Sequence, residues 1–302
     1  MTEPDAGELM QEDPPRCYRH PDRETYVSCT RCGRPICAEC MRPAAVGFHC
    51  PDEVAEARRT VRQPRTALGG RIGGRREATM TLIGINVLVF IIMVASGAGF
   101  FDSGISKLFA EFALVPDRVG FRNSDGSVTV FQGVAHGDYY RLVTSQFLHF
   151  GIVHLGLNMF VLALVGPQLE QVLGRLRFVT LYLLAGIGGG VATYAFGSTS
   201  EIAAGASGAI FGLFGAYYAI ARRFRADTGP IVLTIVINVV FSLSVPHIDI
   251  RAHLGGLVTG AVLGAVLAYA PRERRDAFHL AGFAAMILIL AAITAARTAA
   301  LT

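Results

Sequence analysis

Repeated apolar runs, each near the length of a bilayer-crossing helix, follow one another from about residue 79 onward. A transmembrane helix needs about 20 predominantly apolar residues. The mean hydropathy of +0.45 and the 17% share of charged residues also fit a membrane protein that carries a polar N-terminal appendage. We therefore predict an all-α membrane protein with seven spans, the fourth and fifth short, at about 79–97, 150–166, 179–196, 207–221, 230–245, 252–269 and 279–296.

Arginines mark every other loop of this predicted bundle, and cytoplasmic loops of membrane proteins are enriched in basic residues. The clusters lie before the first span (58–76) and in loops two–three (175–177), four–five (222–225) and six–seven (272–275). We expect a cytoplasmic N-terminus and an outer C-terminus, so the net charge of +4 reflects topology rather than nucleic-acid binding. Residues 1–15 have no apolar core and are predicted to be a disordered start rather than a signal peptide.

All six cysteines fall between positions 17 and 50, and five of them belong to pairs of ligands that are separated by two residues. Such pairs chelate a tetrahedral metal ion well, whereas a disulfide framework is the alternative for a cysteine-rich segment. The expected cytosolic location favours zinc, because structural disulfides are rare in a reducing compartment. Two structural zinc ions with interleaved pairs are predicted, and their clear ligands are Cys17, His20, Cys29, Cys32, Cys37, Cys40 and Cys50.

The eighth zinc ligand is open among three residues. His49 adjoins Cys50 at an awkward spacing, while Asp52 or Glu53 would offer an oxygen. The segment resembles B-box-type cross-braced zinc fingers, in which a cysteine would be expected near Glu53. We expect a zinc-stabilised domain at 16–53 with a structural or partner-binding role, since so short a module depends on its metal to fold. A basic linker at 54–78 follows, near the inner leaflet.

A serine flanked by glycines opens the fourth predicted span, in the sequence Gly205-Ala206-Ser207-Gly208. Glycine lets backbone or substrate approach closely, and it can supply strained turn geometry. The same small residues also pack membrane helices together without any chemistry. Ser207 is therefore a candidate nucleophile only in combination with polar residues from other spans.

The second predicted span places polar side chains inside the membrane. His154 and Asn158 are four residues apart and so share one helix face, and His149 lies close to the outer boundary. Polar groups in a membrane helix are costly and usually face a cavity or one another. If these residues face the helix that begins with Ser207, we expect them to have a functional role and not only a packing role.

The sixth predicted span carries His253 at its outer end, followed by Gly256, Gly260 and Gly264 at four-residue intervals. Glycines at this spacing form a close-packing face, so we expect this helix to press its backbone against a neighbour. No acidic residue is clearly placed to orient His253. Asp249 is close in sequence but is expected in a solvated loop.

Spans two, four and six all begin on the outer side, so their polar residues should meet at one depth. A serine, a histidine that takes its proton and donors for an oxyanion are the components of acyl transfer. Ser207 is the candidate nucleophile and His253 the base, in a dyad. His154, Asn158 and the backbone N–H of Ser207 are candidates for the oxyanion site, and Phe211 could stack on the imidazole.

In combination, these motifs resemble the rhomboid family of intramembrane serine proteases over about residues 79–275. The resemblance rests on His149-x4-His154-x3-Asn158, Gly205-Ala206-Ser207-Gly208, Ala252-His253-x2-Gly256 and the inner-loop pattern Glu170-x3-Gly174-x3-Phe178. It implies a six-helix catalytic core with an added seventh helix (79–297), and a Ser–His dyad supported by Gly205, His149 and Phe211. It also implies cleavage of transmembrane substrates near their outer end, without a catalytic metal.

Two positions depart from the family pattern. Tyr140-Arg141 stands where members often have Trp-Arg, and Phe211 stands where some have tyrosine. A high arginine content with a single lysine, together with the fused finger, is similar to arrangements in high-GC Gram-positive bacteria, so a bacterial plasma membrane is expected.

Two other functions are weighed against the protease. A catalytically inactive rhomboid-like protein would bind membrane clients, but such relatives typically lack the serine or the histidine. A transporter would carry charged residues or inverted repeats in its spans, and neither is found in the sequence. The expected partners are transmembrane substrates, lipid and a protein partner of the finger, not nucleic acid.

Overall fold

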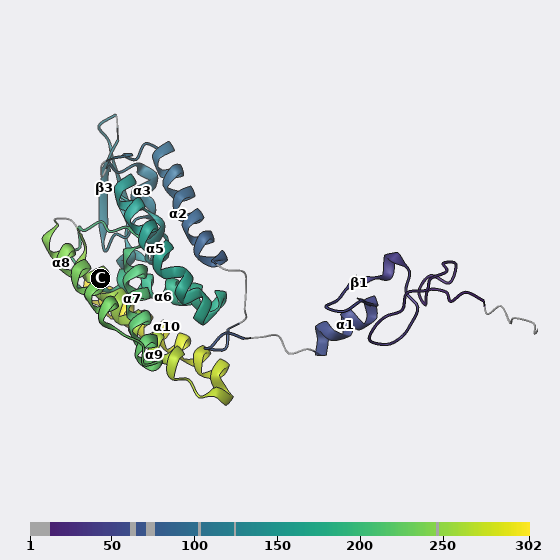
Figure 1. The fold of residues 1–302 in the computed structure, drawn as a ribbon. Coiled ribbons are helices and arrows are strands. Elements are labelled where there is room, and N and C mark those ends of the chain that lie inside the picture. The colour runs from purple at the N-terminus through teal and green to yellow at the C-terminus, as the bar shows by residue number, and fades with distance from the viewer. Residues whose placement is uncertain (1–12, 61–64, 71–75, 102–103, 124, 246–247) are drawn as a thin grey trace, which may run out of the picture. The chain divides into compact units, whose positions relative to one another are not determined.

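The computed structural model describes residues 13–60, 65–70, 76–101, 104–123, 125–245 and 248–302. The chain divides into two compact units, Met1–Gln63 and Pro64–Thr302 (Figure 1). Each unit has a hydrophobic core of its own. Most of the predicted disordered start, 1–15, lies outside the described residues, as do positions 61–64 and 71–75 of the predicted linker.

Five cysteines and Ile36 form the buried core of the first unit. Its regular elements are short: η1 (Ala38–Cys40), the antiparallel strands β1 (Arg42–Pro43) and β2 (Phe48–His49), and helix α1 (Pro51–Thr60). So small an apolar core cannot supply much folding free energy by itself. The fold of this unit therefore depends on the bonds that its cysteines form.

Helix α1 differs from the predicted organisation, because it crosses the expected boundary at residue 53 and continues into the expected linker. Pro51 at the first helical position and the acidic Asp52 and Glu53 in the first turn favour a helix N-terminus. None of its residues is buried. Terminal chemistry, rather than an apolar face, favours this helix, and hydrophobic periodicity could not reveal it.

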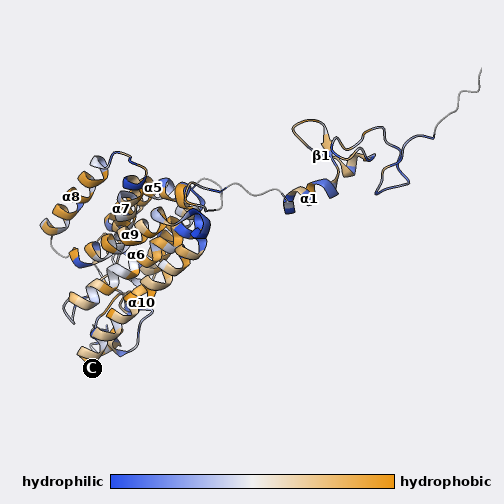
Figure 2. Ribbon diagram, turned by 90° about the horizontal axis from the view of Figure 1, so that it is seen from below, coloured by the Kyte–Doolittle hydropathy of each residue, from blue (hydrophilic) through white to orange (hydrophobic). Residues whose placement is uncertain are grey.

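The second unit is built mainly from seven helices that correspond in order to the seven predicted spans (Figure 1). Five are long and apolar enough to cross a membrane, and α8 is a shorter apolar helix. Apolar residues dominate these helices in Figure 2. Their bounds are α2 (Glu77–Ala95), α5 (Ile152–Leu173), α6 (Arg175–Phe196), α7 (Ser207–Arg223), α8 (Gly229–Ser244), α9 (Ile250–Tyr269) and α10 (Arg275–Leu301).

Several of these helices extend beyond the apolar runs that predicted them. Helix α5 continues to Leu173 rather than ending near 166, and it contains Pro167. Helix α10 begins at Arg275 and ends at Leu301, beyond the predicted 279–296 and the predicted domain end at 297. Hydropathy marks only the part of a helix that is apolar enough to lie in the hydrocarbon layer, so polar end turns escape it.

Helix α7 packs against α6 and α9 inside the second unit, and most of its residues are buried. A side chain at Gly256 would collide with the carbonyl group of Gly208, and one at Gly260 would collide with the backbone of Gly212. Gly264 lies against α7 in the same way. The predicted close-packing face of this span is confirmed, and it brings the backbones of α7 and α9 into contact.

The segment between α2 and α5 corrects the all-α prediction. It contains an antiparallel hairpin, β3 (Arg118–Arg122) with β4 (Val128–Gln132), in which half-buried and exposed residues alternate. Alternation of this kind favours a strand over a helix, and Gly126 provides the positive φ of +83° near the turn. Four short helices complete the segment: α3 (Lys107–Phe112), η2 (Val134–His136), α4 (Arg141–Thr144) and η3 (Ser145–Phe147).

Arg141, from the pair that replaces Trp-Arg, fixes this segment from within. Its side chain is 1% exposed and donates from Nη1 to the carbonyl oxygens of Ala110 and Ala113, both at 2.8 Å. Its Nε also donates to the carboxylate of Asp138 at 3.2 Å. A buried guanidinium satisfied in this way holds helix α3 next to the start of α4.

The predicted inner-loop motif joins three helices at the other end of the unit. Glu170 is buried in α5, and its carboxylate accepts hydrogen bonds from the backbone N–H groups of Ala78 and Thr79, each at 2.9 Å. These are unpaired donors of the first turn of α2, and a carboxylate there also complements the helix dipole. Gly174, with φ +80°, separates α5 from α6, and Phe178 is fully buried.

Candidate functional site

Ser207 is the first residue of α7 and is half-buried. Gly205 lies two residues earlier with φ +140°, a conformation that side-chain-bearing residues rarely adopt. A Cβ atom at Gly205 would lie 2.9 Å from Cε1 of His154 and 3.6 Å from Oγ of Ser207. The missing side chain therefore leaves the serine hydroxyl and the His154 ring at one site.

His253 lies in the first turn of α9 and is buried. Its ring stacks on Phe211, with centroids 4.2 Å apart and planes inclined by 12°, so the predicted stacking is confirmed. A Cβ atom at Gly208 would lie 3.3 Å from the carbonyl oxygen of Ala252. The sequence neighbours of Ser207 and His253 thus pack closely, so these two residues lie on neighbouring turns of the packed helices α7 and α9.

His154 carries a hydrogen bond that distinguishes its two ring nitrogens. The backbone N–H of Phe150 donates to Nδ1 at 3.3 Å. Because Nδ1 accepts, the neutral ring carries its proton on Nε2, and this nitrogen would lie 3.0 Å from a Cβ atom at Gly205. His154 therefore presents an N–H donor on the side of the site where Gly205 precedes the serine.

The two other polar residues predicted for this region surround His154. Asn158 is buried and donates from Nδ2 to the carbonyl oxygen of His154 at 2.9 Å, so the two share one face of α5. His149 is buried, and its ring contacts that of His154 edge-on with centroids 5.0 Å apart. Asn158 retains a second amide proton for another acceptor.

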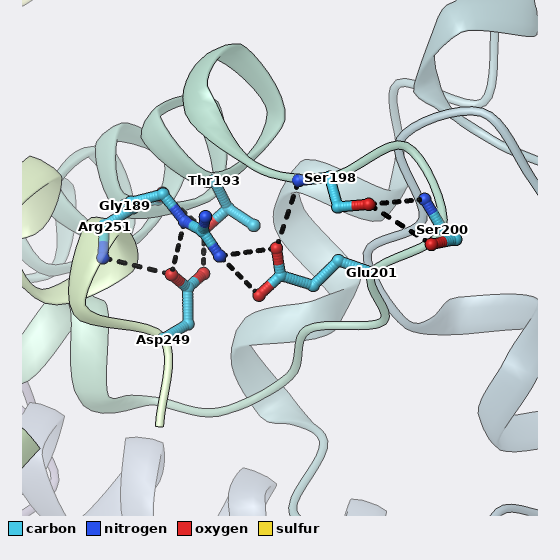
Figure 3. A network of polar contacts seen from close by, with 7 residues as sticks. All are labelled: Gly189, Thr193, Ser198, Ser200, Glu201, Asp249 and Arg251. Carbon is cyan, nitrogen blue, oxygen red and sulfur yellow. Dashed lines mark hydrogen bonds and ion pairs between the residues drawn. The ribbon is translucent and has the colours of Figure 1, made fainter. Parts of the chain in front are cut away.

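Asp249 does not lie in a solvated loop, as the sequence suggested, but caps the N-terminus of α9. One carboxylate oxygen accepts from the backbone N–H of Arg251 at 3.0 Å and from its Nε at 3.2 Å, and the other accepts from the hydroxyl of Thr193 in α6. Arg251 also pairs with Glu201 at 2.5 Å. This network connects the loop before α7 to α6 and α9 (Figure 3).

His253 also makes a contact that was not predicted from the sequence. The hydroxyl Oγ of Ser242, in α8, lies 2.7 Å from Nδ1 of the imidazole. The available signal was the pair Asn238 and Ser242, four apart in a mostly apolar span that also carries Thr234 and Ser244. Such a pair shares a helix face, but the sequence does not say which neighbouring helix that face meets.

In the first unit, four predicted metal ligands form one cluster. The ligand atoms of Cys17, His20, Cys37 and Cys40 all lie within 4.8 Å of one another. Nδ1 of His20 is 3.3 Å from Sγ of Cys37 and 3.4 Å from Sγ of Cys40. Three thiolates and an imidazole are a donor set that suits tetrahedral zinc, so these residues fit the predicted ion.

At least one thiol in each cluster has its pKa lowered by the backbone around it, whereas burial raises the pKa of Cys40 and Cys50. Burial raises the pKa of the Cys17 thiol, but hydrogen bonds from the backbone N–H groups of Cys37 and Arg19 outweigh burial and lower the pKa to about 6. Similar bonds from Cys32 and Arg31 outweigh burial at Cys29 and lower its pKa to about 7. Thiolate is the form that binds metal.

The second cluster provides three thiolates, from Cys29, Cys32 and Cys50. None of the three candidates for the eighth ligand joins it in the described part of the chain. His49 lies in β2 opposite Arg42. The carboxylates of Asp52 and Glu53 pair with Arg34 and Arg31, each at 3.1 Å. A metal here would have an open fourth position or an outside ligand.

Comparison with known proteins gives consistent matches for the second unit. The rhomboid domain family matches residues 136–270. Rhomboid protease GluP of Bacillus subtilis (strain 168) is 38% identical over 165 residues, which cover 53% of this chain and 32% of GluP. RHOMBOID-like protein 6, mitochondrial, of Arabidopsis thaliana is 32% identical over 222 residues, covering 67% of this chain and 72% of that protein.

A fungal relative shows the same relationship. Rhomboid-type serine protease 2 of Emericella nidulans is 31% identical over 153 residues, which cover 49% of this chain and 30% of that protein. The chain thus matches less than a third of the length of GluP and of the fungal protein, and almost three quarters of the plant protein. The matched family segment contains both Ser207 and His253.

Proposed function

Because the chain belongs to the rhomboid family, whose members similar to it include serine proteases, we propose that it is an intramembrane serine endopeptidase. Its substrates are transmembrane proteins, cleaved near their outer end. Ser207 is the nucleophile and His253 the general base. The other residues of the site position these two groups or stabilise the charge that develops on the substrate.

The observation that carries this proposal is the backbone contact between α7 and α9. A Cβ atom built on Gly208 would lie only 3.3 Å from the carbonyl oxygen of Ala252, so the turns that carry Ser207 and His253 pack closely on one another. Phe211 holds the plane of the imidazole by stacking. A nucleophile and a base within reach, with the base held by further groups, are the arrangement that acyl transfer requires.

The reaction follows from these roles. Oγ of Ser207 attacks the carbonyl carbon of the scissile peptide bond, and its proton passes to Nε2 of His253. The imidazolium then gives this proton to the leaving amine, the C–N bond breaks, and an acyl-enzyme remains. A water molecule, deprotonated by the same histidine, hydrolyses the ester and restores the serine hydroxyl.

The oxyanion formed in each step needs donors. We assign this role to Nε2–H of His154, the free amide proton of Asn158 and the backbone N–H of Ser207. The bond from Phe150 to Nδ1 of His154 supports this assignment, because it leaves the proton on Nε2. Loss of one oxyanion donor typically lowers kcat about 100- to 1,000-fold.

The membrane setting is part of the proposal. Helices α2 and α5–α9 form the six-helix core and α10 the added seventh helix, in the plasma membrane of a bacterium. The arginine-rich loops place the N-terminus in the cytoplasm and the C-terminus outside. The N-terminal unit, B-box-like in type, binds two structural zinc ions, one at each cysteine cluster, and has no part in the dyad.

Labelling with a fluorescent fluorophosphonate in detergent tests the activity. We expect the wild-type protein to react, and Ser207→Ala and His253→Ala to remain unlabelled although folded. Phe211→Leu removes the ring that stacks on His253 but no reacting group, so we expect it to be labelled more slowly than the wild type rather than not at all. Absence of labelling in a folded wild-type protein would instead favour an inactive relative that binds membrane clients.

A further inference from the structure

Ser242 is a buried hydroxyl next to the proposed general base. It lies in α8, a helix that packs against α7 and α9, and is 5% exposed. Its Oγ atom makes two contacts of 2.7 Å each, one to Nδ1 of His253 and one to the carbonyl oxygen of Asn238. The second contact joins residues four apart in the same helix, a common bond for serine in helices.

The protons of this group can be counted. A serine hydroxyl has one proton to donate and lone pairs that accept. The carbonyl oxygen of Asn238 can only accept, whereas Nδ1 of the imidazole can accept or donate. Both contacts are hydrogen bonds at once only when the hydroxyl proton points to Asn238. Oγ then accepts from the ring of His253, which requires the proton of the neutral imidazole to be on Nδ1. The lone pair is consequently on Nε2, the nitrogen that a general base needs.

Stacking on Phe211 cannot determine which nitrogen of the His253 ring faces Ser242. The ring planes are inclined by only 12°, and a half-turn of the imidazole about its bond to Cβ keeps the stack while exchanging the sides of the ring. The Asp249 carboxylate is also unsuited to the task, because it faces Arg251 and Thr193. Of the groups in the described part of the chain, Ser242 is the one with a polar contact to the ring.

We propose that Ser242 is a positioning residue that fixes the tautomer and orientation of His253, so that a relay of Asn238, Ser242 and His253 replaces the acid of a triad. This inference rests on the proposed function. When the ring takes the proton of Ser207 it becomes charged, and Oγ of Ser242 then accepts from a charged donor. Such bonds are stronger than neutral ones, so the contact favours the transition state.

Three variants distinguish the effect of the Ser242 hydroxyl from the effect of side-chain shape. Ser242→Thr keeps a hydroxyl that can also bond to Asn238, and Ser242→Val has the shape of threonine without the hydroxyl. Thr234→Val removes a hydroxyl of α8 that bonds to the carbonyl oxygen of Pro230. We expect Ser242→Val to lower kcat about 10- to 100-fold with KM unchanged. Ser242→Thr should retain most of the wild-type kcat, and Thr234→Val all of it.

A readout that needs no turnover completes the test. In protein with ¹⁵N-labelled histidine, the signals of His253 are assigned by their loss in His253→Ala, and we expect the Nδ1–H tautomer in the wild type and in Ser242→Thr but not in Ser242→Val. An Nε2–H tautomer in the wild type, or equal loss of kcat in the threonine and valine variants, overturns the proposal. A folded wild type without activity contradicts the proposed function, while the tautomer still decides whether Ser242 orients the ring.

Discussion

Gly205 is the residue on which the candidate site depends most directly, although it carries no side chain. Its φ of +140° and the nearby ring of His154 both exclude a Cβ atom. We expect Gly205→Ala to lower the rate of fluorophosphonate labelling about 100-fold, because small displacements of reacting groups are that costly. The measurement is the labelling rate under excess probe, with folding checked by thermal unfolding.

Gly97 provides the matched control for this substitution. It also has a positive φ, +96°, but no atom lies within 4 Å of a Cβ atom placed there. Gly97→Ala therefore introduces backbone strain without a collision at the site, and it should keep the wild-type labelling rate. Equal losses in both variants would show that strain, rather than the space beside His154, limits the reaction.

Local sequence motifs could point to candidate site residues, but contacts between helices could not be predicted from them. The glycines around Ser207 and the spacing of His154 and Asn158 are enough, as a sequence pattern, to indicate a site. Ser242 could not be assigned, because its partner His253 is on another helix. Asp249 was placed wrongly, since its position in sequence gave no sign of the partners it meets in α6 and α9.

At the scale of helices, Glu170 is the residue that ties α5 to the start of α2. Its carboxylate accepts three hydrogen bonds, from the backbone of Ala78 and from the backbone and hydroxyl of Thr79. We expect Glu170→Gln to lower the free energy of unfolding by about 2–4 kcal/mol. The neutral amide oxygen accepts hydrogen bonds more weakly than a carboxylate, and the amide NH2 group would face groups that also donate. Unfolding in mixed micelles measures the change.

Glu77 offers a control with the same change of charge at the same helix end. It pairs with Arg175, but both side chains are about half exposed, 52% and 46%. Exposed pairs contribute little, so Glu77→Gln should cost less than about 1 kcal/mol. A similar loss in the two variants would mean that net charge near this end, rather than the buried cap, determines stability.

The five long apolar helices could be predicted because each contains a long apolar run, but the ends of the helices and the pieces between them could not. Polar turns such as the start of α6 at Arg175 add no hydropathy. Membrane helices tolerate proline where neighbours compensate, so Pro167 does not end α5. The β3–β4 hairpin is short, and its alternation is too brief to stand out within a long loop.

At the scale of the whole molecule, the two units are stabilised by different means. The second unit buries a large apolar core drawn from all its long helices. The first unit buries five cysteines and little else. The cysteine pairs were predictable from spacing alone, and their interleaved grouping is confirmed for the first cluster. Spacing did not reveal that Asp52 and Glu53 pair with arginines, or that His49 is outside both clusters.

Removal of metal should therefore affect the two units unequally. Because the proposed zinc ions supply most of the folding free energy of the first unit, a cell-permeant chelator should unfold residues 13–60 and expose them to protease. The second unit has no candidate metal cluster among its described residues. It should keep its thermal midpoint and its labelling at Ser207, measured on the same chelated sample.

The variant Cys17→Ser sharpens this prediction, since it removes one ligand of the four-donor cluster without adding a chelator. We expect one fewer zinc ion per chain by mass spectrometry, faster proteolysis of the first unit and unchanged labelling at Ser207. Cys32→Ser also removes a ligand, and it should release its ion more readily than the wild type. Its cluster has only three described ligands, so two would remain. Loss of labelling in folded Cys17→Ser protein would mean that the first unit controls the candidate site. The two units could then no longer be treated as independent.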